Sequence, residues 1–233
     1  MERIILKLSG EALSNNNGIL SHDKMAELAQ EIKELYDSGY EIGIVNGAGN
    51  IWRGRDSVSN KMDRVTADYI GMLGTEINSL ALADVLKEVA GIKTVVLSAI
   101  PMPVVTPTYT IDEASKYFKE GYICIFGGGT GKPYYSTDTC AALRASELGC
   151  KLILMAKNGT DGVYDSDPRK NPSAKRYDSL SYQTLIDNKL EVIDLAAAKI
   201  CLDNNIESIV FDMNVKGNIK NVVLNKSLGT IIK

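Results

Sequence analysis

Short apolar runs alternate with longer amphipathic segments along almost the whole chain of 233 residues. The apolar runs are predicted to be strands, at residues 3–8, 40–46, 93–99, 122–126, 151–156, 206–211 and 229–232. The longer segments are predicted to be helices, at residues 22–38, 62–90, 111–120, 137–148, 179–188, 194–204 and 215–225. In the first helix, Met25, Leu28 and Ile32 recur at helical spacing, and Ser21 stands where an N-cap is expected.

Several predicted strands are apolar on both faces, as in Val95-Val96-Leu97 and Ile123-Cys124-Ile125. This pattern is typical of a parallel sheet that helices cover on both sides. The sequence therefore predicts an α/β fold, a three-layer αβα sandwich with a mainly parallel central sheet. No clear linker divides the chain, so we expect a single domain, with the polar segment 165–177 as a candidate hinge or lid.

Composition narrows the class of protein. Hydrophobic residues make up 45% and charged residues 24%, which is ordinary for a globular protein, and a net charge of −3 argues against a nucleic-acid binder. No apolar segment approaches the roughly 20 residues of a membrane span, so we expect a cytoplasmic protein with no membrane partner. The four cysteines form no CxxC pair and are interpreted as reduced thiols of the core.

Histidine chemistry has little room in this chain, because His22 is its only histidine. It stands next to Ser21 at the predicted start of a helix, which leaves little room for a Ser-His-Asp triad, a Cys-His pair or a His-rich zinc site. Cys140 lies near a glycine cluster, yet a nucleophilic cysteine would normally need a histidine partner.

Candidate chemistry lies in glycine-containing loops that follow predicted strands, where ligands of open α/β sheets bind. The loops are Lys7–Leu13, Asn46–Gly54, Gly127–Asp138 and Lys157–Pro168. Consecutive glycines let backbone N–H groups converge on a phosphate, although one such cluster can equally be a flexible turn. Lys7 can point at an anion or extend to solvent, and Arg53 can bind two phosphate oxygens. Asp161-Gly162 is either a tight turn or the wall of a second ligand site.

Two familiar nucleotide motifs are excluded. Trp52 occupies the last glycine position of GxGxxG, and Phe126 and Pro133 occupy positions that a P-loop reserves for glycine and a hydroxyl residue. Phosphoryl transfer still suits the loops, because its catalysis is mostly positioning and charge neutralisation and needs no histidine.

The loops resemble, in this order and nearly end to end, the motifs of the amino acid kinase family, and within it those of the bacterial uridylate (UMP) kinases. The motifs that carry the resemblance are Lys7-Leu8-Ser9-Gly10-Glu11-Ala12-Leu13, Asn50-Ile51-Trp52-Arg53-Gly54, Ser98-Ala99-Ile100-Pro101, Gly129-Thr130-Gly131-Lys132-Pro133-Tyr134-Tyr135-Ser136-Thr137-Asp138, Asp161-Gly162-Val163-Tyr164 and Met213-Asn214. The resemblance implies transfer of the γ-phosphoryl group of ATP to UMP, in pyrimidine nucleotide biosynthesis.

The resemblance also implies roles for particular residues. Catalytic roles fall to Lys7, Arg53 and Asp138. ATP binding falls to Lys7, Leu8, Ser9, Gly10, Gly49, Arg53, Asn158, Tyr164 and Asp167. UMP binding falls to Ala48, Asp68, Thr130, Gly131, Lys132, Pro133, Tyr134, Tyr135, Ser136 and Thr137. No residue is assigned as a metal ligand, because Mg²⁺ would be held mainly by nucleotide phosphates and water.

Several alternatives stay open at this point. Asp68 can be a solvated carboxylate, and Asp138 and Asp194 can be helix caps without further function. Ala48 replaces the usual glycine of the family and is tolerable only with a negative φ. The acceptor can be a small carboxylate or carbamate, as in other family members, or the chain can be a non-enzymatic nucleotide-binding regulator.

The resemblance further implies a homohexamer, with UTP as a possible inhibitor and GTP as a possible effector. It divides the domain into an acceptor-binding lobe, roughly residues 1–150, and an ATP-binding lobe, roughly 151–233. The small residues Ala67, Gly71 and Gly74 of the long predicted helix are candidates for a close packing surface.

Overall fold

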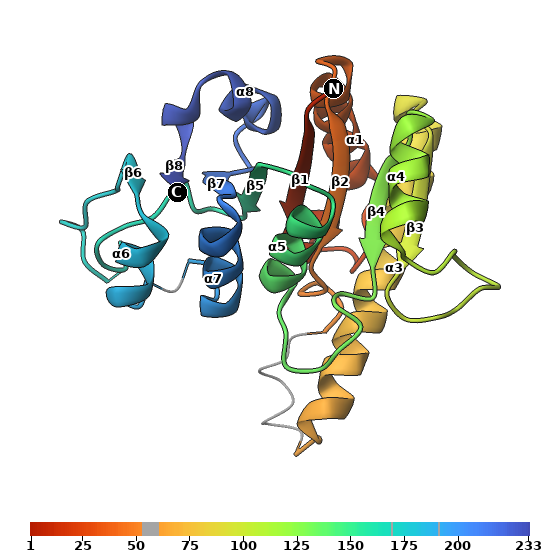
Figure 1. The fold of residues 1–233 in the computed structure, drawn as a ribbon, viewed down its shortest axis with the longest axis horizontal. Coiled ribbons are helices and arrows are strands. Elements are labelled where there is room, and N and C mark those ends of the chain that lie inside the picture. The colour runs from red at the N-terminus through yellow and green to blue at the C-terminus, as the bar shows by residue number, and fades with distance from the viewer. Residues whose placement is uncertain (53–60, 169, 191) are drawn as a thin grey trace.

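The computed structural model describes residues 1–52, 61–168, 170–190 and 192–233. These residues form one sheet of eight strands in the order β3-β4-β2-β1-β5-β7-β8-β6 (Figure 1). The strands are β1 (Arg3–Leu8), β2 (Glu41–Asn46), β3 (Thr94–Ser98), β4 (Ile123–Gly127), β5 (Leu152–Lys157), β6 (Ser179–Leu180), β7 (Glu207–Asp212) and β8 (Thr230–Ile232).

The sheet is mainly parallel, as predicted. β1 lies in its middle and pairs in parallel with β2 on one side and with β5 on the other. The pairing of β7 with β8 is antiparallel, whereas the other paired strands run in parallel. Apolar side chains point to both faces, because the sheet is covered on both sides.

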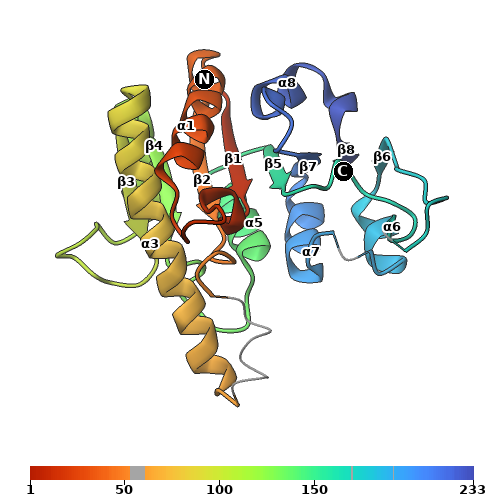
Figure 2. The ribbon, with the colours of Figure 1, turned by 180° about the vertical axis from the view of Figure 1, so that it is seen from behind.

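Helices cover the two faces, which confirms the three-layer sandwich. They are α1 (His22–Asp37), α3 (Arg64–Ala90), α4 (Ile111–Lys119), α5 (Thr137–Glu147), α6 (Tyr182–Asp187), α7 (Leu195–Asn204) and α8 (Asn218–Leu224), with short 3₁₀ turns η1 (Gly10–Leu13) and η2 (Lys226–Leu228). One core cluster joins α1, α3 and α8 to the sheet, and the other joins α4, α5, α6 and α7 to the opposite face (Figures 1 and 2).

Both cores extend over the sheet from β3 to β7. Ile4 and Leu6 of β1 pack in the same cluster as Leu154 of β5 and Ile209 of β7. On the other face Ile5 lies in one cluster with Ile153 and Val210. No break in apolar packing separates the first 150 residues from the rest in the described part of the chain.

The helix predicted at 179–188 is only partly right. Ser179–Leu180 form the edge strand β6, which pairs in parallel with β8. The side chain of Ser181 then accepts a hydrogen bond from the backbone N–H of Thr184 and so starts α6 at Tyr182. An N-cap residue has extended backbone dihedrals, so the helix cannot reach back through it.

Two smaller expectations are confirmed. Ser21 caps α1 by accepting a hydrogen bond from the N–H of Lys24. All four cysteines are buried free thiols, as expected for core residues. Among the described residues, no helix is both long and apolar enough to cross a membrane.

Candidate functional site

The loops that follow β1, β2 and β4 meet at one edge of the sheet, because these strands are parallel and in register. Lys7 lies opposite Val45 of β2 and Met155 of β5. A Cβ built on Gly10 would lie 2.5 Å from the carbonyl oxygen of Gly47, and one built on Gly47 would lie 3.7 Å from Oγ1 of Thr137. Only glycine at position 10 allows this approach.

Two lysines and one carboxylate form the centre of this edge. Nζ of Lys7 lies 2.8 Å from Oδ1 of Asp138, and Nζ of Lys157 lies 3.3 Å from Oδ2 of the same side chain. The three residues come from the ends of β1 and β5 and from the first turn of α5. Lys7 is buried beside Asp138, so the interpretation that it extends to solvent is wrong.

Two ammonium groups share the carboxylate of Asp138, and the carboxylate of Asp194 also acts on Lys157. Burial raises the pKa of Asp138, but Lys7 and Lys157 outweigh burial and lower it to about 2. Burial lowers the pKa of Lys157, and Asp138 opposes that shift. The ammonium groups of Lys7 and Lys157 stand together at the strand ends, an arrangement that suits a phosphate.

Asp138 is not the cap of α5, so that interpretation is wrong. The cap is Ser136, whose Oγ accepts hydrogen bonds from the N–H of Asp138 and from the N–H of Thr139 at 3.0 and 3.1 Å. The side chain of Asp138 is therefore available for the two lysines.

Asp194 does more than cap a helix. It accepts the N–H of Ala197 at 2.8 Å as the cap of α7, and it also binds Oγ1 of Thr139 at 2.9 Å and Oγ of Ser136. These contacts fix the N-terminus of α5 against α7, two helices that lie side by side in Figure 1.

The loop after β4 has the backbone that its glycines predict. The φ angles of Gly128, Gly129 and Gly131 are 72°, 58° and 74°, in the left-handed region that favours glycine. Oγ1 of Thr130 donates to the carbonyl of Lys132 and accepts from its N–H, at 3.0 and 3.2 Å, which closes the turn. The following residues are half-buried or exposed, from Lys132 to Thr137.

Asp68 lies beside this loop and is not a free solvated carboxylate. Its Oδ2 accepts the backbone N–H of Tyr134 at 2.7 Å, and both of its oxygens lie 2.9 Å from Nε of Arg64. Tyr134 itself has a φ of 73°. A tyrosine in the left-handed region is strained, and the hydrogen bond to Asp68 helps to hold it there.

A second hollow lies on the other side of the lysines. A cavity of about 650 Å³ is lined by the loop after β5, which contains Asn158, Tyr164 and Asp167, and by Lys189, Leu190 and Val192. Asn158 donates to Oε2 of Glu11 at 3.3 Å and so connects this cavity to the loop after β1. The apolar and polar lining suits a nucleoside next to the phosphate-binding edge.

The remaining expected residues are placed as follows. Ser9 and Gly10 begin the turn after β1, and Leu8 is buried, so only its backbone faces the site. A Cβ on Gly49 would lie 3.6 Å from Glu11. Ala48 is not among the residues with positive φ, so alanine is tolerable at this position. Arg53 lies outside the described residues.

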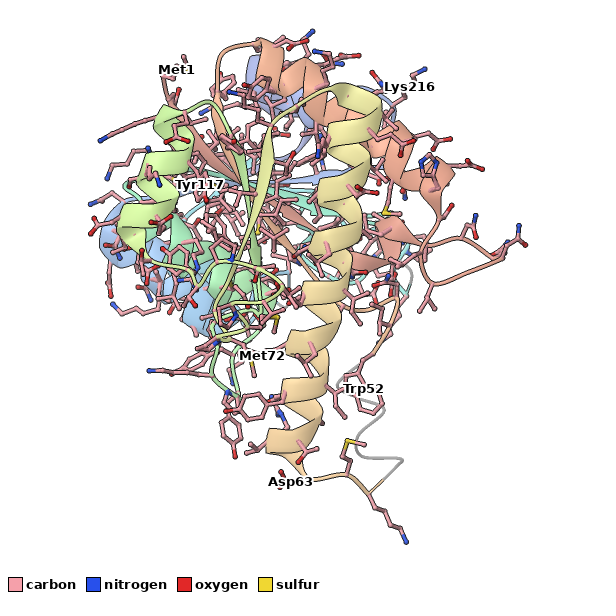
Figure 3. The ribbon with its side chains drawn as sticks, turned by 90° about the vertical axis from the view of Figure 1, so that its right-hand side faces the viewer. Met1, Trp52, Asp63, Met72, Tyr117 and Lys216 are labelled. Carbon is pink, nitrogen blue, oxygen red and sulfur yellow. The ribbon has the colours of Figure 1, made fainter. Side chains whose placement is uncertain are left out.

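The small residues of α3 pack within the chain. A Cβ on Gly74 would lie 2.9 Å from Cβ of Ala48, and one on Gly71 would lie 3.7 Å from Trp52. Figure 3 shows Trp52 beside α3, between the levels of Met72 and Asp63. Gly71 and Gly74 therefore allow the loop after β2 to approach the helix, and their close packing is used inside the molecule.

Sequence reasoning missed a row of buried polar residues on α3. Oγ1 of Thr75 accepts the N–H of Gly128 at 3.0 Å, and Nδ2 of Asn78 donates to the carbonyl of Gly47 at 2.8 Å. The amide of Asn46 lies 2.8 Å from Oγ of Ser79. The sequence does show that polar residues recur in this otherwise apolar helix. It does not show which residues they contact, so their role could not be predicted.

Comparisons with known proteins agree with this geometry. The model of the amino acid kinase family matches residues 2–212. The uridylate kinase of Streptococcus thermophilus (strain ATCC BAA-250 / LMG 18311) is 47% identical over 99% of this chain and 94% of its own length. The crystal structure of UMP kinase from Ureaplasma parvum covers 100% of this chain and 98% of its own, with 39% identity and a TM-score of 0.93. That of UMP kinase from Bacillus anthracis covers 100% and 96%, with 39% identity and a TM-score of 0.96.

Fold, converging strand-end loops and matches over nearly the full length all lead to the same result. The chain belongs to the amino acid kinase family.

Proposed function

We propose that this protein transfers the γ-phosphoryl group of ATP to UMP and releases UDP and ADP. The observation that carries the proposal is the cluster of Lys7, Asp138 and Lys157. It lies where the acceptor loop after β4 and the cavity after β5 meet, so an acceptor phosphate and a donor phosphate would both reach its two ammonium groups.

The geometry suits direct transfer. Lys7 is held by Asp138 and needs little reorganisation to neutralise charge on the transferred group, which is the main task in phosphoryl transfer. Backbone N–H groups of the glycine loops would orient the phosphates for in-line attack. No covalent enzyme intermediate is needed, because the two substrates meet at the cluster.

Mg²⁺ is the proposed cofactor, and the residues present fit an ion that arrives with ATP. No three His, Cys, Asp or Glu residues gather into a cage within the part of the chain that is described. Both oxygens of Asp138 are in contact with lysines. Mg²⁺ commonly keeps water and phosphate oxygens as ligands and then needs no such cage; when bound it neutralises phosphate charge.

The acceptor is proposed to be UMP because of the loop from Thr130 to Thr137 and its contact with Asp68. Asp68 would accept hydrogen bonds from the ribose hydroxyls, and polar groups of the loop would face the uracil edge. A site built on hydrogen bonds rejects analogues that leave its polar groups unpaired.

We propose one domain with two lobes, the acceptor lobe near residues 1–150 and the ATP lobe near 151–233. The cavity after β5 belongs to the second lobe, whereas Asp68 and the loop after β4 belong to the first. The continuous sheet supports a single folding unit. We place the protein in the cytoplasm, where free thiols such as these four are usual.

A homo-oligomer, a hexamer by the resemblance, is proposed to form through α3. Its residues Tyr69, Leu73, Ile77 and Leu80 share one helical face and are 38–47% exposed. A large exposed apolar stripe of this kind is typical of a protein–protein contact. UTP as an inhibitor and GTP as an effector complete the proposal.

The test is a coupled assay of ADP release with ATP and a panel of acceptors. UMP is expected to be turned over, and CMP, AMP, glutamate, aspartate and carbamate much less. Turnover of a carboxylate or carbamate without turnover of UMP would establish the rival acceptor. Nucleotide binding without any ADP release would establish a regulator. The same assay with added UTP and GTP tests both effectors.

A further inference from the structure

Glu76 places a carboxyl group inside the protein, on the buried face of α3. The residue is 3% exposed. Its Oε1 accepts a hydrogen bond from Oγ1 of Thr106 at 3.3 Å. Its Oε2 is buried and has no hydrogen-bond partner within the described ranges.

No charged partner of this carboxyl group lies among the residues that the structure describes. The groups that face it are the hydroxyl of Ser98 from β3, the hydroxyl of Thr106 from the segment after β3, and the backbone of Gly127 from β4. Burial raises the pKa of Glu76 more than the two hydroxyls lower it. The neutral acid is therefore favoured relative to an exposed glutamate.

The carboxyl group occupies the space where residue 127 would carry a side chain. A Cβ built on Gly127 would lie 2.1 Å from Oε2 and 3.0 Å from Oε1 of Glu76. Glycine at 127 and glutamate at 76 are therefore matched in volume. Any larger residue at 127 would displace the carboxyl group.

Gly127 is the last residue of β4 and the root of the acceptor loop. Its carbonyl accepts the N–H of Ala99 at 3.0 Å, and the next residue, Gly128, donates to Thr75. A Cβ on Gly131 would lie 3.0 Å from the carbonyl oxygen of Ala99. Thr75 and Glu76, adjacent on α3, thus contact two consecutive residues from which the loop starts.

We propose that Glu76 is a positioning residue of the acceptor site, whose buried carboxyl group fills the space beside Gly127 and fixes the strand end from which Gly128–Gly131 turns toward the acceptor. The proposal rests on the proposed function, because it concerns the loop assigned to UMP. Glu76 contacts neither substrate and acts only through this loop.

Substitutions at 76 test the role of the carboxyl group. Glu76→Ala is expected to raise KM for UMP about tenfold through loss of positioning, with KM for ATP nearly unchanged. Glu76→Gln keeps the shape of the side chain and its ability to form hydrogen bonds, and is expected to keep KM for UMP within about twofold of the wild type. Glu88→Gln, on the same helix but exposed, is the matched control and should change neither constant.

Substitutions at 127 test the match in volume. Gly127→Ala alone is expected to raise KM for UMP, because its methyl group collides with Oε2. In the double variant Gly127→Ala/Glu76→Ala the methyl group enters the vacated space, and KM should move back toward the wild-type value. Effects that simply add would contradict the pairing.

Hydrogen exchange supplies a readout that needs no activity. Amides in peptides that cover residues 127–131 should exchange faster in Glu76→Ala and at the wild-type rate in Glu76→Gln. Failure of the wild type to turn over UMP would contradict the proposed function, but it would not affect the comparison of hydrogen-exchange rates. An Ala variant that is wild-type in both KM and exchange, or a Gln variant as impaired as Ala, would overturn the role of Glu76.

Discussion

At the scale of single residues, the site depends on one carboxylate that holds two ammonium groups. Asp138 keeps Lys7 and Lys157 close together although their charges repel. The arrangement is preorganised, because Asp138 holds both ammonium groups in position before a phosphate binds. Each residue of the cluster should therefore affect the reaction more than the binding of either substrate alone.

Lys7→Ala is expected to lower kcat by about two orders of magnitude, because charge that develops on the transferred group loses its nearest cation. KM for UMP should change little. Steady-state assays with varied ATP and UMP measure both constants, and Lys33→Ala on the exposed surface is the control. A folded Lys7→Ala enzyme with nearly normal kcat would remove Lys7 from the mechanism.

Asp68→Asn is expected to act on the acceptor instead. KM for UMP should rise about tenfold, as one charged hydrogen-bond acceptor for the ribose is lost, while kcat is largely retained. Asp84→Asn, exposed on the same helix, is the matched control. An equal loss of kcat and kcat/KM in both Lys7→Ala and Asp68→Asn would contradict their separate roles.

The positions of Lys7 and of the glycine loop at strand ends were predictable from the sequence, because both follow apolar runs and the parallel sheet brings such ends together. Asp138 was predicted only through the family resemblance, because its partners Lys7 and Lys157 are distant in the sequence. Thr75, Glu76 and Asn78 were not predictable in the same way. Helical spacing shows that they share a face, but their partners are set by how α3 crosses the strand ends.

At the scale of elements, the N-terminus of α5 connects the loop after β4 with the cluster of Lys7, Asp138 and Lys157. Ser136 caps the helix, Asp138 points to the lysines, and Thr139 binds Asp194 at the start of α7. One helix turn thus holds the acceptor loop, the charged cluster and the neighbouring helix in a fixed relation.

Ser136→Ala is expected to lower the free energy of unfolding by about 1 kcal/mol, the usual cost of a lost N-cap. Because the same turn presents Asp138, kcat/KM for UMP should fall as well. Thr110→Ala removes the cap of α4, a helix that holds no residue of the proposed site, and should cost similar stability with no kinetic effect. Urea unfolding and steady-state kinetics compare the pair; matching kinetic losses in both would count against a special role of α5.

The edge strand β6 is an element that could not be predicted from the sequence. Apolar spacing across residues 179–188 favours one helix, yet Ser181 is a good N-cap and β8 offers a free edge to Ser179–Leu180. The free edge of β8 exists only in the folded protein, so the local sequence does not reveal it. Two residues in a strand are too few to show a period of their own.

At the scale of the whole molecule, two buried carboxyl groups respond to pH in opposite directions. The pKa of Asp138, lowered to about 2 from 3.8, means that its pairing stabilises the fold above pH 4 and is lost as pH falls toward 2. The pKa of Glu76 is raised, so its contribution is present below its ordinary value of 4.5 and is lost as pH rises through the raised value.

The stability difference between the wild type and Asp138→Asn is therefore expected to shrink by about 2 kcal/mol as pH falls from 5 toward 2. The free energy of unfolding of Glu76→Gln should instead increase relative to that of the wild type as pH rises. Urea unfolding at several pH values measures both differences. A difference for Asp138→Asn that stays constant with pH would contradict the lowered pKa.

The exposed stripe of α3 belongs to this scale too, because it concerns how copies assemble. Leu73→Glu would place a charge on the stripe and is expected to shift the protein to smaller species in analytical ultracentrifugation. Val104→Glu, on another highly exposed apolar residue, is the control. An unchanged sedimentation profile for Leu73→Glu would place the contact elsewhere.

The position of β1 in the middle of the sheet has a consequence for how the chain folds. β1 pairs with the nearby β2 and with β5, from which most of the chain separates it in sequence. Contacts between distant segments form late, since a long loop must close first. In a partly folded chain in which only β1, α1 and β2 have formed, Lys7 has not yet met the carboxylate of Asp138. During refolding, enzymatic activity should therefore return in the slowest phase and in one step, when β5 and α5 reach β1.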